Sequence, residues 1–97
     1  MEMVAIYNDF AFYYDRLMGD VDYGKWADYI EKLFNRKKLR PKLIADLGCG
    51  TGSFCLEMAS RGYEMIGIDI STEMLSCARQ KAIEANDFSA SFLMGYD

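Results

Sequence analysis

The sequence predicts an α/β fold in which a small parallel sheet of about three strands is flanked by helices. Two observations predict this fold class. Short apolar runs of strand length alternate with longer segments of helical periodicity, an order typical of parallel strands joined by right-handed crossovers. Three glycines at alternate positions, Gly48, Gly50 and Gly52, stand between the first of these apolar runs and a helical segment. They predict a tight turn from strand to helix.

Two helices are expected before this turn. An aromatic-rich segment at residues 8–18 predicts a helix that ends at Gly19. A second helix is predicted at 23–38, with Asp22 as its N-cap and Pro41 just beyond its end. Apolar residues recur in this second helix at spacings of three and four. They predict one buried face, made of Trp26, Ile30, Leu33 and Phe34.

From Pro41 onward the pattern alternates between strand and helix. The predicted segments are a buried parallel strand at 42–47, a helix at 53–61, a strand at 63–70, a helix from 72 to 85 and a strand at 89–96. Gly62 closes the first of these helices, and Ser71 or Thr72 caps the second. The inward positions of the second helix are predicted to be Met74, Leu75, Ala78 and Ala82.

Composition is that of one globular domain. The chain has 97 residues, of which 52% are hydrophobic and 27% charged, and this balance excludes disordered and collagen-like classes. No apolar run reaches the roughly 18 residues that a membrane-spanning helix needs. The amino terminus also lacks the basic region of a secretory signal. We therefore expect a cytoplasmic protein without membrane contact.

Charge and cysteine content exclude further classes. The net charge is −4, and the basic residues gather at 36–40 near the end of a predicted helix, where cations are favourable. We interpret this cluster as solvated and expect no nucleic-acid partner. Cys49, Cys55 and Cys77 lack the paired spacing of a zinc site, and the chain has no histidine to activate a thiol. The sequence therefore predicts neither a metal site nor a catalytic nucleophile.

Two acids give the glycine turn its predicted chemistry. Asp46 stands two residues before the first glycine. A carboxylate there suits a ligand with an ammonium group and would repel a pyrophosphate. Asp69 ends the next strand, and ligands of open α/β sheets bind outside the carboxyl ends of the strands. Its two oxygens can accept hydrogen bonds from both hydroxyls of a ribose.

The motif Asp46-Leu-Gly48-Cys-Gly50-Thr-Gly52 resembles the first motif of the class I S-adenosylmethionine-dependent methyltransferases of small-molecule type. These enzymes have a Rossmann-like sheet of seven strands. The dinucleotide spacing G-x-G-x-x-G fails here because Ser53 stands where the third glycine belongs. The segment 64–70, with its acid at Asp69, strengthens the resemblance, which implies S-adenosylmethionine as the cofactor.

The resemblance also implies roles for individual residues. Asp46 and the loop backbone would hold the methionine part, and Asp69 the ribose. Ile70 and Met74 would pack against the adenine; the alternative is that they are ordinary core residues, and it weighs more for Met74, because methionine fills cores readily. The full predicted cofactor-binding set is Tyr14, Asp46, Gly48, Cys49, Gly50, Thr51, Gly52, Asp69, Ile70, Met74 and Asp97. In this set Tyr14 belongs to an amino-terminal lid, and Asp97 would accept from the adenine amino group.

The resemblance covers the amino-terminal half of the family. We expect residues 1–97 to form the cofactor-binding part of a single methyltransferase domain, with a helical lid or cap at 1–40 and a βαβαβ core at 41–97. The later strands, which in the family supply much of the acceptor pocket, are absent. We therefore expect a truncated product that does not complete catalysis alone. Its strand at 42–47 would leave an unpaired edge, which predicts a homo-oligomer.

Three functions remain open at this stage. The first is a methyltransferase that acts on a small-molecule acceptor. The second is a fragment of a nicotinamide-nucleotide-binding oxidoreductase. The strand-loop-helix pattern and Asp69 favour it, and the glycine spacing and Asp46 oppose it. The third is a non-catalytic, self-associating fold.

Overall fold

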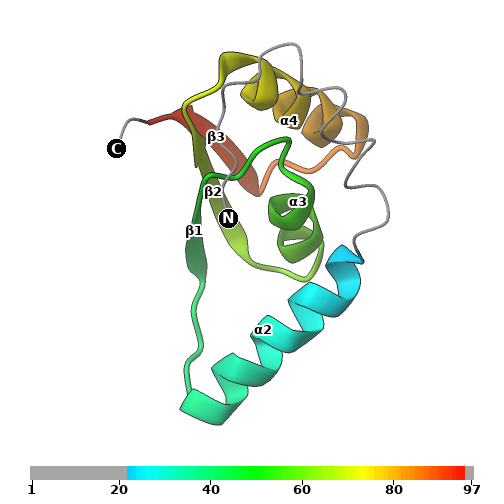
Figure 1. The fold of residues 1–97 in the computed structure, drawn as a ribbon. Coiled ribbons are helices and arrows are strands. Elements are labelled where there is room, and N and C mark those ends of the chain that lie inside the picture. Colours follow the sequence, from blue (N-terminus) through cyan, green and yellow to red (C-terminus); the bar gives the residue numbers. More distant parts are fainter. Residues whose placement is uncertain (1–21, 96–97) are drawn as a thin grey trace.

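The computed structural model describes residues 22–95 as a three-stranded parallel sheet with helices (Figure 1). The strands are β1 (Leu43–Leu47), β2 (Glu64–Asp69) and β3 (Ala90–Met94), and they lie side by side in that order. The helices are α2 (Tyr23–Lys37), α3 (Ser53–Ser60) and α4 (Thr72–Glu84). The predicted α/β class with a small parallel sheet is confirmed. The helix expected at 8–18 lies outside the described residues.

Helix α2 begins where the sequence predicts but presents a different face. Asp22 caps it by accepting the Lys25 N–H at 3.0 Å. Ala27 is its buried residue, and Ile30 and Phe34 pack against the core. The positions of α2 that contact the core are therefore 27, 30 and 34, which share one side of a helix. Trp26 lies one residue, about 100°, away from it and is 54% exposed, so its predicted burial is wrong.

One face of the sheet carries the core. Helices α3 and α4 pack against the strands (Figure 1), and Met58, Met65, Leu75 and Phe92 are buried among them. The four predicted inward residues of α4 are all buried. Ser71 rather than Thr72 caps α4, accepting the Met74 N–H at 3.2 Å.

Strand β1 was predicted to be buried, and this is wrong. Leu43 is 56% and Leu47 75% exposed. Strand β1 lies at an edge of the described sheet, and successive side chains of a strand point to opposite faces. Leu43 and Leu47 point to the face away from the helices, so they stay open to solvent.

The far end of the sheet is held by ionic contacts. Arg61, just after α3, bonds three acidic side chains and the Gly24 carbonyl of α2. The acids are Asp28 and Glu31, each at 2.8 Å, and Glu57 at 3.0 Å. The Tyr63 hydroxyl also donates to Glu31, at 2.8 Å. These contacts tie α2 to α3 at the end of the sheet opposite the glycine turn. Among residues 22–95, no helix has the length and apolar character needed to cross a membrane.

Candidate cofactor site at the glycine loop

The glycine loop connects β1 to α3 at the carboxyl ends of the strands. Gly48, Gly50 and Gly52 have φ values of 77°, 59° and 82°, a region that residues with a β-carbon rarely adopt. The N–H groups of Gly48 and Cys49 both donate to the Ile68 carbonyl, at 2.7 and 3.0 Å. The loop is therefore fixed to the end of β2, and its backbone requires the alternating glycines.

Asp69 joins the loop to the start of α4. One of its oxygens accepts the Gly50 N–H at 2.8 Å and the other accepts the Ser71 N–H at 3.0 Å. The residue is only 8% exposed. The sequence predicted a ligand contact at Asp69 but not this bracing role, because the loop and α4 meet only in the folded chain. Each carboxylate oxygen has two lone pairs, so further hydrogen bonds remain possible.

Asp46 is a half-buried carboxyl group with a weak partner. Its Oδ2 lies 3.6 Å from the Cys55 thiol, which donates to it, and no cation within residues 22–95 pairs with it. Burial raises the pKa of Asp46 above its ordinary value of 3.8. Burial also raises the pKa of Cys55, after the larger effect of its hydrogen bond with Cys49. Asp46 thus remains able to pair with a positively charged ligand group.

The other loop side chains point into the protein. Thr51 is 1% exposed, and Cys49 is also buried. The Cys49 Sγ lies 2.8 Å from the position that a Cβ on Gly67 would occupy, so Gly67 makes room for the loop. Any contact of Cys49 or Thr51 with a ligand would therefore come from their backbone.

The predicted adenine contacts differ in exposure. Ile70, directly after Asp69, is 45% exposed, whereas Met74 in the first turn of α4 is buried. A ligand can reach Ile70 without rearrangement of its side chain. Met74 fits the alternative of a packed residue better. Tyr14 and Asp97 lie outside the described residues.

Lys81 contacts the loop region, and the sequence analysis missed it. Its ammonium donates to the Thr51 hydroxyl at 3.3 Å and to the Ser53 hydroxyl at 2.8 Å. It thereby links α4 to the loop and to the first residue of α3. No local pattern marks this contact, because 28 residues separate Ser53 from Lys81.

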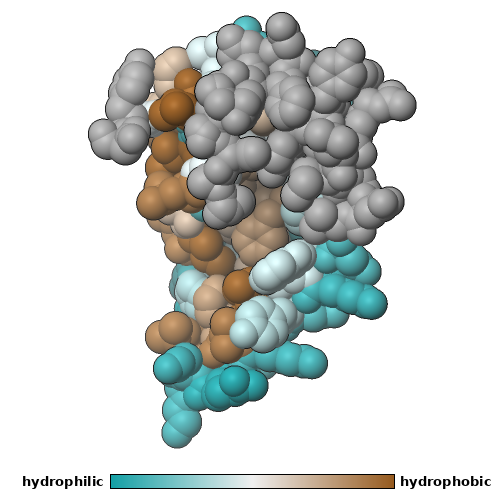
Figure 2. Space-filling view, in the orientation of Figure 1, coloured by the Kyte–Doolittle hydropathy of each residue, from teal (hydrophilic) through white to brown (hydrophobic). Residues whose placement is uncertain are grey.

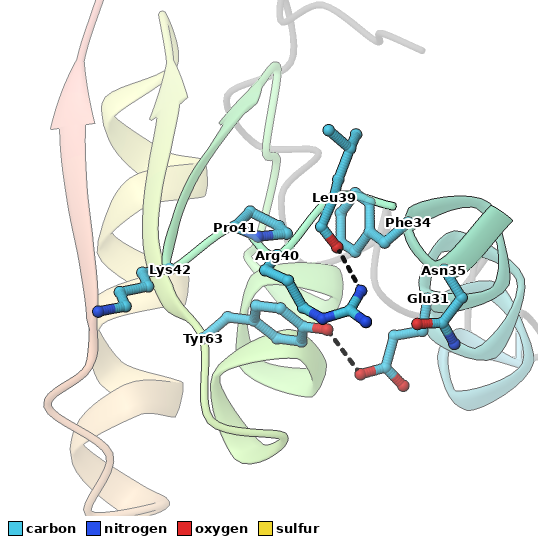
Figure 3. A pocket seen from close by; sticks show the side chains of 8 residues that line it. All are labelled: Glu31, Phe34, Asn35, Leu39, Arg40, Pro41, Lys42 and Tyr63. Carbon is cyan, nitrogen blue, oxygen red and sulfur yellow. Dashed lines mark hydrogen bonds between the residues drawn. The ribbon is translucent and has the colours of Figure 1, made fainter. Parts of the chain in front are cut away.

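A pocket of about 460 Å³ lies at the other end of the sheet, between the end of α2 and the starts of β1 and β2 (Figure 3). Three of its polar side chains are already in use. Tyr63 donates to Glu31, which is also paired with Arg61, and the Arg40 guanidinium donates to the Leu39 carbonyl. The hydrogen bond from Tyr63 and then that from Arg61 lower the pKa of Glu31. The glycine loop, rather than this pocket, offers an acid without a cationic partner among the described residues.

Comparison with known proteins agrees with this geometry. Residues 44–95, which include the loop, Asp46 and Asp69, match the sequence model of the methyltransferase domain family. This match covers more than half of the chain. The chain belongs to the methyltransferase domain family.

Curated relatives of this methyltransferase chain are much longer than it is. It is 45% identical over 76 residues to YqeM of Bacillus subtilis, which is assigned as a methyltransferase, covering 78% of this chain and 29% of that protein. A Geobacillus protein assigned in the same way is 36% identical over 87 residues, with 89% and 35% covered. The chain thus spans about a third of the length of these relatives.

A solved structure shows the same fold with its cofactor class. The crystal structure of an S-adenosylmethionine-dependent methyltransferase from Clostridium acetobutylicum superposes with a TM-score of 0.74 at 31% identity. The match covers 91% of this chain and 36% of that one. The Rossmann-like class and the resemblance to class I enzymes are confirmed, and S-adenosylmethionine is the cofactor that the family match implies. The residues present fit it, since the loop backbone and Asp46 can receive an amino acid group.

Proposed function

We propose that this chain is the cofactor-binding part of an S-adenosylmethionine-dependent methyltransferase that acts on a small molecule in the cytoplasm. One observation carries the proposal. The glycine loop stands between two acids at the carboxyl ends of β1 and β2, and one of them, Asp46, has no cationic partner within the described residues.

The chain's residues would bind and orient the cofactor. Asp46 would pair with the ammonium of the methionine part, and the backbone of residues 48–52 would lie against that part. Asp69 would use its remaining lone pairs for the ribose hydroxyls while it braces Gly50, and Ile70 would cover one side of the adenine. The cofactor supplies a methyl group activated on a sulfonium. Correct orientation toward the acceptor is then the main contribution of the protein.

The division of the chain into a cap and a cofactor-binding core belongs to the proposal as well. We assign residues 1–40 to a helical cap and 41–97 to the cofactor-binding core of the same domain. Tyr14 and Asp97 stay predictions for cofactor contacts. We also propose that transfer uses parts of the protein outside these residues, since the matches cover only 29% and 35% of the relatives.

A small-molecule acceptor is the finer part of the proposal. Related proteins differ in the acceptor that their names give. One match is a protein arginine methyltransferase of Dictyostelium discoideum, and another is a 23S rRNA uracil methyltransferase of Thiobacillus denitrificans. The net charge of −4 disfavours a polyanionic acceptor. Three free cysteines agree with a reducing compartment.

Equilibrium dialysis with labelled S-adenosylmethionine tests the proposed cofactor. We expect saturable binding that unlabelled S-adenosylhomocysteine displaces and NAD does not. Displacement by NAD at similar concentration would instead favour the dinucleotide alternative. A folded chain that binds neither would contradict the proposal for these 97 residues.

A further inference from the structure

The Asp46 side chain lies on the covered face of the sheet. Asp46, Gly67 and Phe92 stand in register across β1, β2 and β3, and Phe92 is buried in the core. Because successive side chains of a strand point to opposite faces, Asp46 points toward the helices, away from the exposed side chains of Leu43 and Leu47. Its carboxylate is therefore partly removed from water.

Cys55 donates a hydrogen bond to this carboxylate. It is the third residue of α3 and is fully buried, and its thiol lies 3.6 Å from the Asp46 Oδ2. Within residues 22–95 no other group donates to the Asp46 side chain. The contact thus fixes one carboxylate oxygen, and the lone pairs of the second oxygen remain for a ligand.

The thiol donates without adding charge. Its hydrogen bond with Cys49 and its burial raise the pKa of Cys55 above the ordinary value of 9.0, so the group stays protonated near neutral pH. A lysine or arginine at the same place would form an ion pair with Asp46, and a ligand ammonium would have to displace it. The neutral thiol orients the carboxylate and leaves its negative charge for the ligand. By contrast, the exposed side chains of Leu47 and Leu93 belong to the apolar side of the sheet, where Figure 2 shows apolar surface.

Packing alone is the other explanation for Cys55. Cysteine is a common small core residue, and Cys55 belongs to the buried cluster that also contains Met58 and Ala59. Packing does not account for the neighbouring carboxylate, however, because burying a charged group is costly without a hydrogen bond. The thiol supplies that bond from inside the core.

We propose that Cys55 is a positioning residue for the cofactor: its thiol holds the Asp46 carboxylate in the orientation that pairs with the ammonium of the methionine part. This inference rests on the proposed function, because that ammonium belongs to S-adenosylmethionine. Cys55 itself does not touch the cofactor, since its side chain is fully buried. It acts through Asp46 alone.

Calorimetric titration with S-adenosylhomocysteine, which keeps the ammonium, tests this role with two variants of matched size. Alanine and serine have similar volumes, but only serine has a hydroxyl donor. Cys55→Ala should bind about three- to tenfold more weakly than the unmodified chain, as the loss of one hydrogen bond predicts, and Cys55→Ser should recover most of this loss. Cys77→Ala, which removes a half-buried thiol of α4, is the control and should bind normally. Equal affinities of Cys55→Ala and Cys55→Ser overturn the inference.

A ligand without the ammonium separates positioning of Asp46 from general damage to the loop. Methylthioadenosine carries the nucleoside of the cofactor and lacks its amino acid group. Cys55→Ala should bind it within about twofold of the unmodified chain, and in an Asp46→Ala background Cys55→Ala should cost no further affinity for S-adenosylhomocysteine. Equal weakening of both ligands, or additive losses in the double variant, overturns the inference.

Carbon NMR titration of the Asp46 carboxyl group tests the contact without any ligand. Burial raises the pKa of Asp46, and the hydrogen bond from Cys55 opposes this effect. The pKa of Asp46 should therefore be higher in Cys55→Ala than in Cys55→Ser, and equal values overturn the contact itself. An unmodified, folded chain that binds no S-adenosylhomocysteine contradicts the proposed function, and the ligand role of Cys55 with it. Binding that is equally tight in Cys55→Ala overturns this inference alone.

Discussion

The two ends of the sheet use polar groups in different ways. At the amino ends of β1 and β2, Arg61 forms ion pairs with acidic side chains, and Tyr63 donates a hydrogen bond to one of them. These contacts hold α2 against α3. At the carboxyl ends, Asp69 bonds backbone N–H groups, and Asp46 has only a thiol partner among the described residues. This difference is the reason that we propose the carboxyl end of the sheet as the ligand-binding end.

The largest effect is expected from Gly52→Ala in the loop. A Cβ at Gly52, whose φ is +82°, would lie 2.9 Å from the Cβ of Ala78 and 3.0 Å from the Phe92 ring. We expect a loss of about 2–4 kcal/mol in the free energy of unfolding, measured by urea denaturation. Gly62→Ala is the matched control, because its φ is +102° with nothing within 4 Å. It should lose only about 1 kcal/mol. Equal losses would contradict the close approach of the loop to α4 and β3.

Asp69→Ala should give the next largest effect. It leaves the buried N–H groups of Gly50 and Ser71 without their acceptor, at a total cost of about 2 kcal/mol, the lower end of the range for two such groups. Asp69→Asn keeps one acceptor oxygen and should lose about half as much. Chemical denaturation measures both variants. An Asp69→Ala chain as stable as the unmodified one would mean that Asp69 does not brace the loop.

Arg61→Met should weaken the amino end without touching the carboxyl end. Its partners are partly exposed, with Asp28 61% exposed, so we expect a smaller loss of stability than in Gly52→Ala or Asp69→Ala. Affinity for S-adenosylhomocysteine should stay within about twofold, because additivity holds for distant sites. Arg40→Met, which loses only a bond to the neighbouring Leu39 carbonyl, is the control. A large loss of affinity in Arg61→Met would show that the two ends are coupled.

The contributions of Glu31 and Asp46 to stability, one at each end of the sheet, should change with pH in opposite directions. The pKa of Glu31 is lowered by Tyr63 and Arg61, so its contribution to stability is present above its ordinary value of 4.5 and is lost as the pH falls through the folded value. The pKa of Asp46 is raised by burial above 3.8. Its ionisation therefore lowers stability as the pH rises through the folded value.

Denaturation at several acidic pH values measures these slopes. Glu31→Gln should remove a rise of stability with pH, and Asp46→Asn should remove a fall. Changes of the same sign in both variants would contradict the assigned causes.

The sequence predicted what depends on local pattern. The glycine loop, the cap at Asp22 and the strand ends were found within one or two residues, because turn and cap chemistry involves close neighbours. The rotation of α2 toward Ala27 and the exposure of Leu47 were not found. Both depend on which element packs against the helix or the strand. Trp26 also stands at the spacing expected of a buried residue in a helix. Lys81 reaches the loop only through the fold.

Calorimetric titration with S-adenosylhomocysteine tests the central claim most directly, that the carboxyl end of the sheet is a cofactor site. The unmodified chain and Glu73→Gln, an exposed acid on α4, should bind with one site per chain. Asp46→Asn keeps the shape but removes the charge, and should bind at least about tenfold more weakly, or about 1.4 kcal/mol. Equal affinity of Asp46→Asn and the unmodified chain would contradict the account.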